Sequence, residues 1–145
     1  MIVIDSMLGK LSRYLRMMGY DIEYIENDKD DSFIIDVSKG CLVVTRDKLL
    51  HERINNSILL KTYRTLDQLR ELKDKLPKPD HGFMELCSVC GSVLEKTKEN
   101  SNFPDYVNKQ AKEIFYCKKC DKYYWEGSHT DNFRKMVERI GFEVH

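Results

Sequence analysis

Two pairs of cysteines with identical spacing are the strongest chemical pattern in the sequence. Cys87 and Cys90 form the first pair, and Cys117 and Cys120 form the second. Each Cys-X-X-Cys pair can make a tight turn that offers two thiolates to one ion, and two such turns complete the tetrahedron of structural zinc. Two disulfides or a redox-active pair are the alternative, but we expect no secretory leader, and a thioredoxin-like motif needs only one pair. The spacing therefore predicts one structural zinc ion in a zinc ribbon, with no open position for a substrate.

Aspartates recur just after the apolar segments that we expect to form strands. The acids concerned are Asp5, Asp28, Asp30, Asp31 and Asp47. Parallel strands end at one edge of a sheet, where ligands bind, so these carboxylates would converge and repel one another unless a divalent cation joined them. Oxygen ligands of this kind favour Mg²⁺ or Mn²⁺, which can activate water and neutralise charge on a phosphodiester. As the alternative, Asp47 and one of Asp30 or Asp31 cap helices and the other acids are solvated charges. The joint pattern favours a catalytic metal site.

The first predicted helix carries cations near Asp5. Lys10, Arg13 and Arg16 lie roughly opposite an apolar stripe, which predicts an exposed basic face. The stripe consists of Leu8, Leu11, Leu15 and Met18. A basic face of this kind can hold a nucleic-acid backbone. From spacing alone, a purely solubilising face is an equal alternative.

Several other side chains have both a binding and a structural interpretation. Arg46 can contact a phosphate or pair with the neighbouring Asp47, and His129 can bind substrate or can pack against or cap the following helix. The aromatic side chains of the second half could stack on bases, but in a segment with few aliphatic residues we expect them to form its core. These residues are Tyr116, Tyr123, Tyr124 and Trp125. We expect Cys41 to be an inert buried strand residue.

The elements that must position these residues alternate between strand and helix. Apolar runs predict strands over 1–4, 22–25, 41–45 and 58–61, and helical spacing of apolar residues predicts helices over 7–18, 32–39, 47–54 and 65–76. Alternation of this kind implies parallel strands joined by right-handed crossovers. The predicted fold class is therefore α/β, a parallel-sheet sandwich with helices on both faces.

A linker with two prolines and a glycine, residues 77–82, separates this part from a second unit. Strand-like segments surround the cysteine pairs, and a helix with an apolar stripe closes the chain. The predicted strands are 83–86, 92–94, 114–116 and 123–125, and the predicted helix is 130–140. We therefore expect two domains, an α/β domain over 1–80 and a zinc ribbon with a C-terminal helix over 81–145.

Composition constrains the partners only weakly. The chain has 145 residues, with 24 basic and 24 acidic side chains and a formal net charge of +0. This balance neither demands nor excludes a polyanionic partner, because local patches matter more than net charge. No apolar run approaches membrane-spanning length, so we expect a soluble, cytoplasmic protein without a membrane partner.

The ordered motifs resemble the Mut-seven C-terminal RNase domain family. The resemblance rests on the segment from Asp5 to Gly19, on Thr45-Arg46-Asp47, on both cysteine pairs, and on Tyr124-Trp125-Glu126-Gly127-Ser128-His129. It covers nearly the whole chain. The resemblance implies a PIN-like nuclease fold followed by a zinc ribbon, with strand-end acids that cut RNA through a divalent metal.

The resemblance also implies roles for individual acids. Asp5 and Asp47 match the strand-end acids of the family, and Asp30 or Asp31 matches its middle acid. PIN nucleases usually have a fourth acid, which in this chain would be Glu52 or a second member of the group at 28–31.

The leading functional hypothesis is a metal-dependent, endonucleolytic ribonuclease. In this hypothesis Asp5, Asp31 and Asp47 are ligands of Mg²⁺ or Mn²⁺, with Asp30 in support. RNA would be guided by Lys10, Arg13, Arg16, Arg46 and His129. The alternative is a non-catalytic module that binds RNA or associates with the ribosome through rRNA. A phosphatase is disfavoured because the position two residues after Asp5 is Met7 rather than an aspartate, and a receiver domain is disfavoured because it would need paired acids after its first strand.

Overall fold

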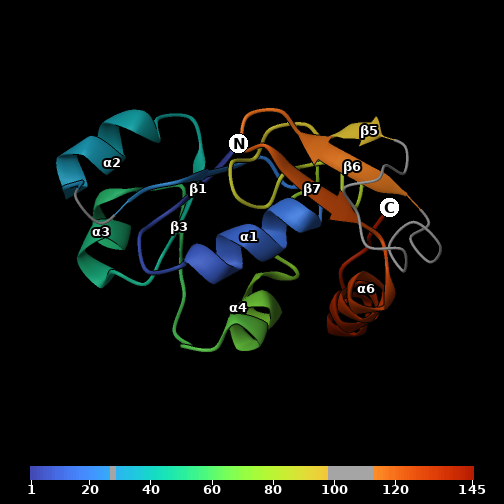
Figure 1. The fold of residues 1–145 in the computed structure, drawn as a ribbon. Coiled ribbons are helices and arrows are strands. Elements are labelled where there is room, and N and C mark those ends of the chain that lie inside the picture. Colours follow the sequence, from blue (N-terminus) through green and yellow to red (C-terminus); the bar gives the residue numbers. More distant parts are fainter. Residues whose placement is uncertain (27–28, 98–112) are drawn as a thin grey trace.

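The computed structural model describes residues 1–26, 29–97 and 113–145, and its N-terminal part is built on a parallel sheet (Figure 1). Four short strands pair in parallel in the order β2-β1-β3-β4. They are β1 (Ile2–Ile4), β2 (Ile22–Tyr24), β3 (Leu42–Thr45) and β4 (Ser57–Leu59). The predicted α/β class with a parallel sheet is therefore confirmed.

Helices cover both faces of this sheet. The helices are α1 (Gly9–Met17), α2 (Asp31–Val37), α3 (Lys48–Arg53) and α4 (Thr65–Leu72). Side chains alternate between the two faces of a strand. Accordingly, Ile4 belongs to the same buried cluster as Leu15 of α1 and Leu69 of α4, whereas Val3 belongs to a second cluster with Ile34 of α2. Figure 1 shows α2 and α3 together, apart from α1 and α4.

Two elements end earlier than their apolar pattern predicts. β4 ends at Leu59, because the backbone N–H groups of Lys61 and Thr62 donate to the carboxylate of Glu71 instead of extending the ladder. Helix α4 ends at Leu72 rather than at residue 76. Apolar periodicity marks the buried face of an element but not the residue at which its hydrogen bonding stops.

The second part of the chain is a small antiparallel sheet followed by a helix. Its elements are β5 (Glu95–Thr97), β6 (Ile114–Cys117), β7 (Lys122–Trp125) and α6 (Ser128–Ile140), with strand order β5-β6-β7. The predicted strands at 83–86 and 92–94 are wrong, since they meet only in a single bridge between Leu86 and Val93. The strand β5 was not predicted because its sequence, Glu-Lys-Thr, is polar and two of its residues are exposed.

The segment that joins the two parts is bonded to the end of α1. His81 N–H donates to the carbonyl of Gly19, and Met84 N–H donates to that of Met17. Gly19 has a φ of 100°, and a Cβ there would lie 2.0 Å from the carbonyl oxygen of His81, so this approach requires glycine. Residues of α1 and of the ribbon share one buried cluster. The predicted division at residue 80 stays a prediction. None of the helices that the structure describes is long and apolar enough to span a membrane.

Candidate functional site

The four paired cysteines form one compact sulfur cluster. Their Sγ atoms all lie within 4.8 Å of one another, with 3.9 Å between Cys87 and Cys120 and 3.5 Å between Cys90 and Cys117. Corners of a tetrahedron of thiolates about 2.3 Å from a zinc ion are about 3.8 Å apart. A disulfide would require about 2.0 Å. The cluster can therefore hold a metal ion such as zinc, as the spacing predicts.

Each cysteine pair is shaped by a residue in the left-handed region directly after its second cysteine. Gly91 follows Cys90 with a φ of 79°, and Asp121 follows Cys120 with a φ of 51°. The turn of the first pair is closed by hydrogen bonds from Gly91 N–H to the carbonyl of Cys87 and from Cys87 N–H to the carbonyl of Ser92. We call residues 87–92 the first knuckle.

The thiols of the cluster differ in proton affinity. Burial raises the pKa of Cys90, but hydrogen bonds with the side chain and backbone of Ser92 outweigh it and lower the pKa to about 6. The hydrogen bond with Cys90 raises the pKa of Cys120 to about 12, and burial raises the pKa of Cys117. A bound cation would stabilise the thiolate forms of Cys117 and Cys120, whose pKa values are raised in its absence.

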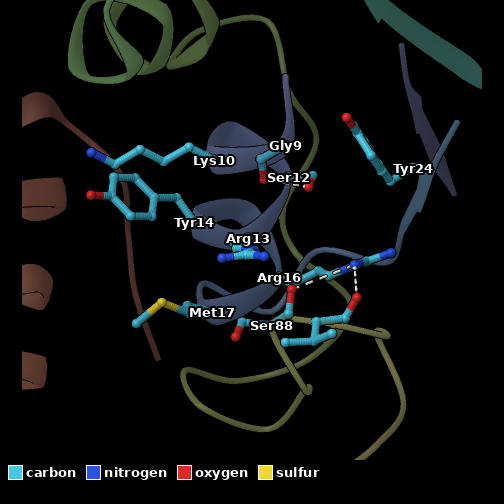
Figure 2. Close-up of a pocket in the computed structure, with 10 residues that line it drawn as sticks. Gly9, Lys10, Ser12, Arg13, Tyr14, Arg16, Met17, Tyr24 and Ser88 are labelled. Atoms are coloured by element: carbon cyan, nitrogen blue, oxygen red, sulfur yellow. Dashed lines mark hydrogen bonds between the residues drawn. The ribbon is translucent and has the colours of Figure 1, made fainter. Parts of the chain in front are cut away.

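Arg16 is buried, so the expectation that it belongs to an exposed basic face is wrong. The residue is 6% exposed, and its guanidinium lies beside Ser88 of the first knuckle (Figure 2). Nη1 donates to the carbonyl of Val89 at 2.7 Å, and Nη2 donates to that of Ile22 at 2.9 Å. The first knuckle covers this end of α1, which helical spacing alone could not indicate. Arg16 therefore connects α1, β2 and the metal-binding turn.

One hydroxyl group connects Asp5 and Asp47 at the carboxyl edge of the sheet. Thr45 Oγ1 donates to Asp5 Oδ2 at 2.7 Å and accepts the backbone N–H of Asp47 at 2.9 Å. Asp5 Oδ1 accepts the N–H of Ser6, and Asp47 Oδ1 accepts the N–H groups at the start of α3. Asp47 is therefore a helix cap as well as a strand-end acid. Thr45 is fully buried at the end of an otherwise apolar strand. A polar residue in such a strand is the sequence feature that could have indicated its role at the site.

The other predicted acids are held elsewhere. Asp30 caps α2 by accepting the N–H of Phe33, and Asp31 lies 3.7 Å from Arg53, the last residue of α3. Glu52 is exposed, and Asp28 lies outside the described residues. Within the described ranges, no group of three acidic side chains gathers in the way that the cysteines do. The expected convergence of three carboxylate sources is therefore not found among these residues.

Lys10 and Arg13 keep the exposed position predicted for them. A depression of about 600 Å³ lies along α1, bounded by both cations, by Tyr24 of β2 and by Ser88 of the first knuckle. In Figure 2, Lys10 and Tyr14 extend to one side of α1 and Tyr24 stands on the other. Tyr24 pairs with Ile4, the residue before Asp5, so the depression adjoins the carboxyl edge of the sheet.

A second depression of about 490 Å³ lies on the other side of Lys10. Tyr63 and Arg64 line it, and the guanidinium of Arg46 stacks on the ring of Tyr63 at 3.8 Å from its centroid. Arg46 thus packs on an aromatic ring instead of forming the ion pair with Asp47. Tyr63 is 81% exposed, and sequence analysis gave it no role. Cations therefore flank the site on both sides of α1.

The tyrosines of the ribbon make contacts within the ribbon itself. Tyr116 packs on Tyr123 and donates to Asp121, and the hydroxyl of Tyr124 lies 3.1 Å from Cys87 Sγ. His129 is exposed and does not cap α6. Gly127 and Thr130 make that cap, because Gly127 N–H donates to Thr130 Oγ1. The capping alternative for His129 is therefore wrong.

A parallel α/β sheet with an acid pair at its carboxyl edge, joined to a four-cysteine ribbon, defines the structural class of this protein. The family model described as Mut7-C RNAse domain matches residues 1–137, so the chain belongs to this family, as its motifs indicate. Among curated proteins and among solved structures, no match to the chain was found. Membership of a family of ribonuclease domains indicates a nuclease-like role with RNA as the substrate.

Proposed function

We propose that the protein is a ribonuclease that cleaves RNA internally and depends on a divalent metal ion. The observation that carries this proposal is the pair Asp5 and Asp47, joined through Thr45 at the carboxyl edge of the sheet. The exposed cations Lys10 and Arg13 adjoin that edge, in a chain that belongs to a family of RNase domains.

The donor set at this edge suits Mg²⁺ or Mn²⁺. Asp47 Oδ1 is engaged in capping, which leaves its Oδ2 without a hydrogen bond among the described residues. Asp5 Oδ2 accepts one hydrogen bond, from Thr45, and keeps a second lone pair for a cation. Mg²⁺ is commonly bound by one or two carboxylates, with waters and substrate phosphates as further ligands. Two aspartates are therefore sufficient to hold the ion. Asp30, Asp31 and Glu52 are proposed only as supporting acids, which cleavage does not require. Such an ion would activate water and neutralise charge on the phosphodiester.

The remaining residues act on the RNA or on the site. Lys10 and Arg13 would bind backbone phosphates along α1, and Arg46 on Tyr63 would do so on the opposite side. Thr45 holds the Asp5 carboxylate in one orientation. The zinc ribbon would be structural, because four protein thiolates leave no ligand position for substrate.

Circular single-stranded RNA tests this proposal, because a circle has no end for an exonuclease. We expect Mn²⁺ or Mg²⁺ to convert the circle first to a full-length linear strand and then to fragments. Asp5→Asn should abolish this conversion while the zinc content stays unchanged, which separates the catalytic ion from the structural one. Conversion of the circle by Asp5→Asn at the wild-type rate would contradict the proposed site.

A non-catalytic module that binds RNA, including rRNA in the ribosome, is the second candidate. It is favoured by the capping roles of Asp30 and Asp47, which give both acids a structural use. This candidate predicts RNA binding without cleavage under every divalent metal tested. Co-sedimentation with ribosomes in that case would identify rRNA as the partner.

A further inference from the structure

We propose that a pocket between α1 and the ribbon is a subsite for one nucleobase of single-stranded RNA. The pocket has a volume of about 210 Å³ and lies where α1, the first knuckle, β7 and the start of α6 meet. Sites for drug-sized ligands are about 300–1,000 Å³, so this pocket suits a single heterocycle. The inference rests on the proposed function, because it assumes that RNA occupies the cationic depression along α1.

The pocket is continuous with that depression. Met17 and Ser88 line both of them, so they form adjoining parts of one surface. A phosphate held by Lys10 or Arg13 would therefore have its own or a neighbouring base within reach of the pocket. This adjacency of exposed cations and an aromatic pocket favours a nucleotide over an uncharged aromatic ligand.

The aromatic walls of the pocket are held in place from behind. The Tyr124 hydroxyl is hydrogen-bonded to Cys87 Sγ at 3.1 Å, and Tyr124 pairs with Phe115 of the neighbouring strand β6. A ring fixed by the metal-binding turn loses little freedom when a base stacks on it. The next residue, Trp125, is half-buried and also lines the pocket, so it can offer its indole to the same base.

Two polar groups of the pocket, on Trp125 and His129, are available to a ligand. Neither the Trp125 indole N–H nor the His129 imidazole has a hydrogen-bond partner among the residues that the structure describes. A Cβ added to Gly127 would lie 3.8 Å from both Trp125 Cδ1 and His129 Nδ1, so no side chain separates the two rings. An apolar pocket with a donor and an imidazole at its rim matches the π-face and polar edge of a nucleobase.

Trp125 is the single tryptophan of the chain, so its fluorescence reports directly on this pocket. Zinc-loaded, full-length protein is titrated with a short single-stranded RNA in the absence of added divalent metal, and with the same backbone carrying abasic positions. We expect the RNA to quench the fluorescence and the abasic strand to bind without quenching. Trp125→Leu, followed by anisotropy of labelled RNA, should weaken binding of the RNA about ten-fold but leave binding of the abasic strand unchanged.

His129→Ala should weaken RNA binding in the same selective way, with His145→Ala at the exposed C-terminus as the matched control. Zinc content and circular dichroism verify that each variant is folded. Equal quenching by both strands, or equal affinity of Trp125→Leu and the wild type for RNA, would overturn the subsite. Because the titration needs no turnover, cleavage is measured separately with added Mn²⁺ or Mg²⁺. Quenching by RNA together with no cleavage in that second assay would reject the ribonuclease and retain the subsite. Cleavage without quenching would reject the subsite and retain the ribonuclease.

Discussion

The hydroxyl of Thr45 donates to Asp5 Oδ2 at 2.7 Å and, through the same oxygen, accepts the N–H of Asp47. Because Thr45 is fully buried at the end of β3, its geometry is fixed by the sheet and not by solvent. The orientation of the Asp5 carboxylate is therefore coupled to the start of α3. A small change at Thr45 should reach both acids without altering the charge of either.

Thr45→Val tests this coupling, because it removes the hydroxyl and keeps the shape. We expect kcat for RNA cleavage to fall by at least ten-fold with little change in KM, since the proposed RNA contacts of Lys10 and Arg13 lie on α1. Stability should fall by about 1–3 kcal/mol, because the N–H of Asp47 loses its acceptor in a partly buried position. Thr45→Ser should restore most of the activity, and a valine variant with wild-type kcat would show that the hydroxyl has no part in catalysis.

Asp47→Asn separates the capping role of this residue from its role at the metal. Asparagine caps helices about as well as aspartate, so the melting temperature should change little. Cleavage should nevertheless be lost, because the amide removes the negative charge that a divalent cation requires. Asp30→Asn is the matched control, since Asp30 makes the same type of cap on α2. Loss of cleavage in both variants would instead make Asp30 a required ligand of the ion. Loss in neither variant would show that both aspartates act only as helix caps.

The exposed cations of α1 should contribute to RNA binding through charge. For Lys10→Ala/Arg13→Ala, we expect the slope of log affinity against log salt to become shallower by about 1.4, at roughly 0.7 per phosphate contact on a single strand. Lys78→Ala/Lys135→Ala removes two exposed charges that line neither of the two cationic depressions and should leave the slope unchanged. Equal slopes for the two double variants would mean that Lys10 and Arg13 form only a solubilising face of α1.

Arg16 should behave as a structural residue even though it is only one helical turn from Arg13. Arg16→Ala leaves the carbonyls of Val89 and Ile22 without their donors, so we expect a loss of roughly 2–4 kcal/mol in stability. Zinc should also be released more readily, because the first knuckle loses its contact with α1. Arg13→Ala should change neither property. Chemical denaturation and zinc release to a chromogenic chelator measure the two effects, and equal results for the two variants would contradict this assignment.

One zinc ion per chain is expected in the reduced protein, and Cys117→Ser/Cys120→Ser should abolish its retention. Because metal binding and folding are coupled, the ribbon and its contacts with α1 should lose protection from hydrogen exchange first. The parallel sheet should be affected less, since its second cluster around Val3 and Ile34 contains no ribbon residue. Elemental analysis and exchange measurements provide the readouts. Retention of zinc by the double variant would contradict the four-thiolate site.

The sequence by itself determined the features that depend on local spacing. The two Cys-X-X-Cys pairs specify the metal cluster, apolar periodicity specifies the alternating strands and helices, and parallel pairing then places Asp5 and Asp47 at one edge. Only the tertiary structure decided which of these residues are free to act. Periodicity indicates that Arg13 and Arg16 lie opposite the apolar stripe of α1, but it does not indicate that a knuckle some seventy residues later covers only Arg16. The carbonyl groups of that knuckle, the hydroxyl of Thr45 and the pocket beside Trp125 are set by contacts between distant segments. Whether such a contact buries or orients a given side chain cannot be inferred from the residues adjacent to it in the sequence.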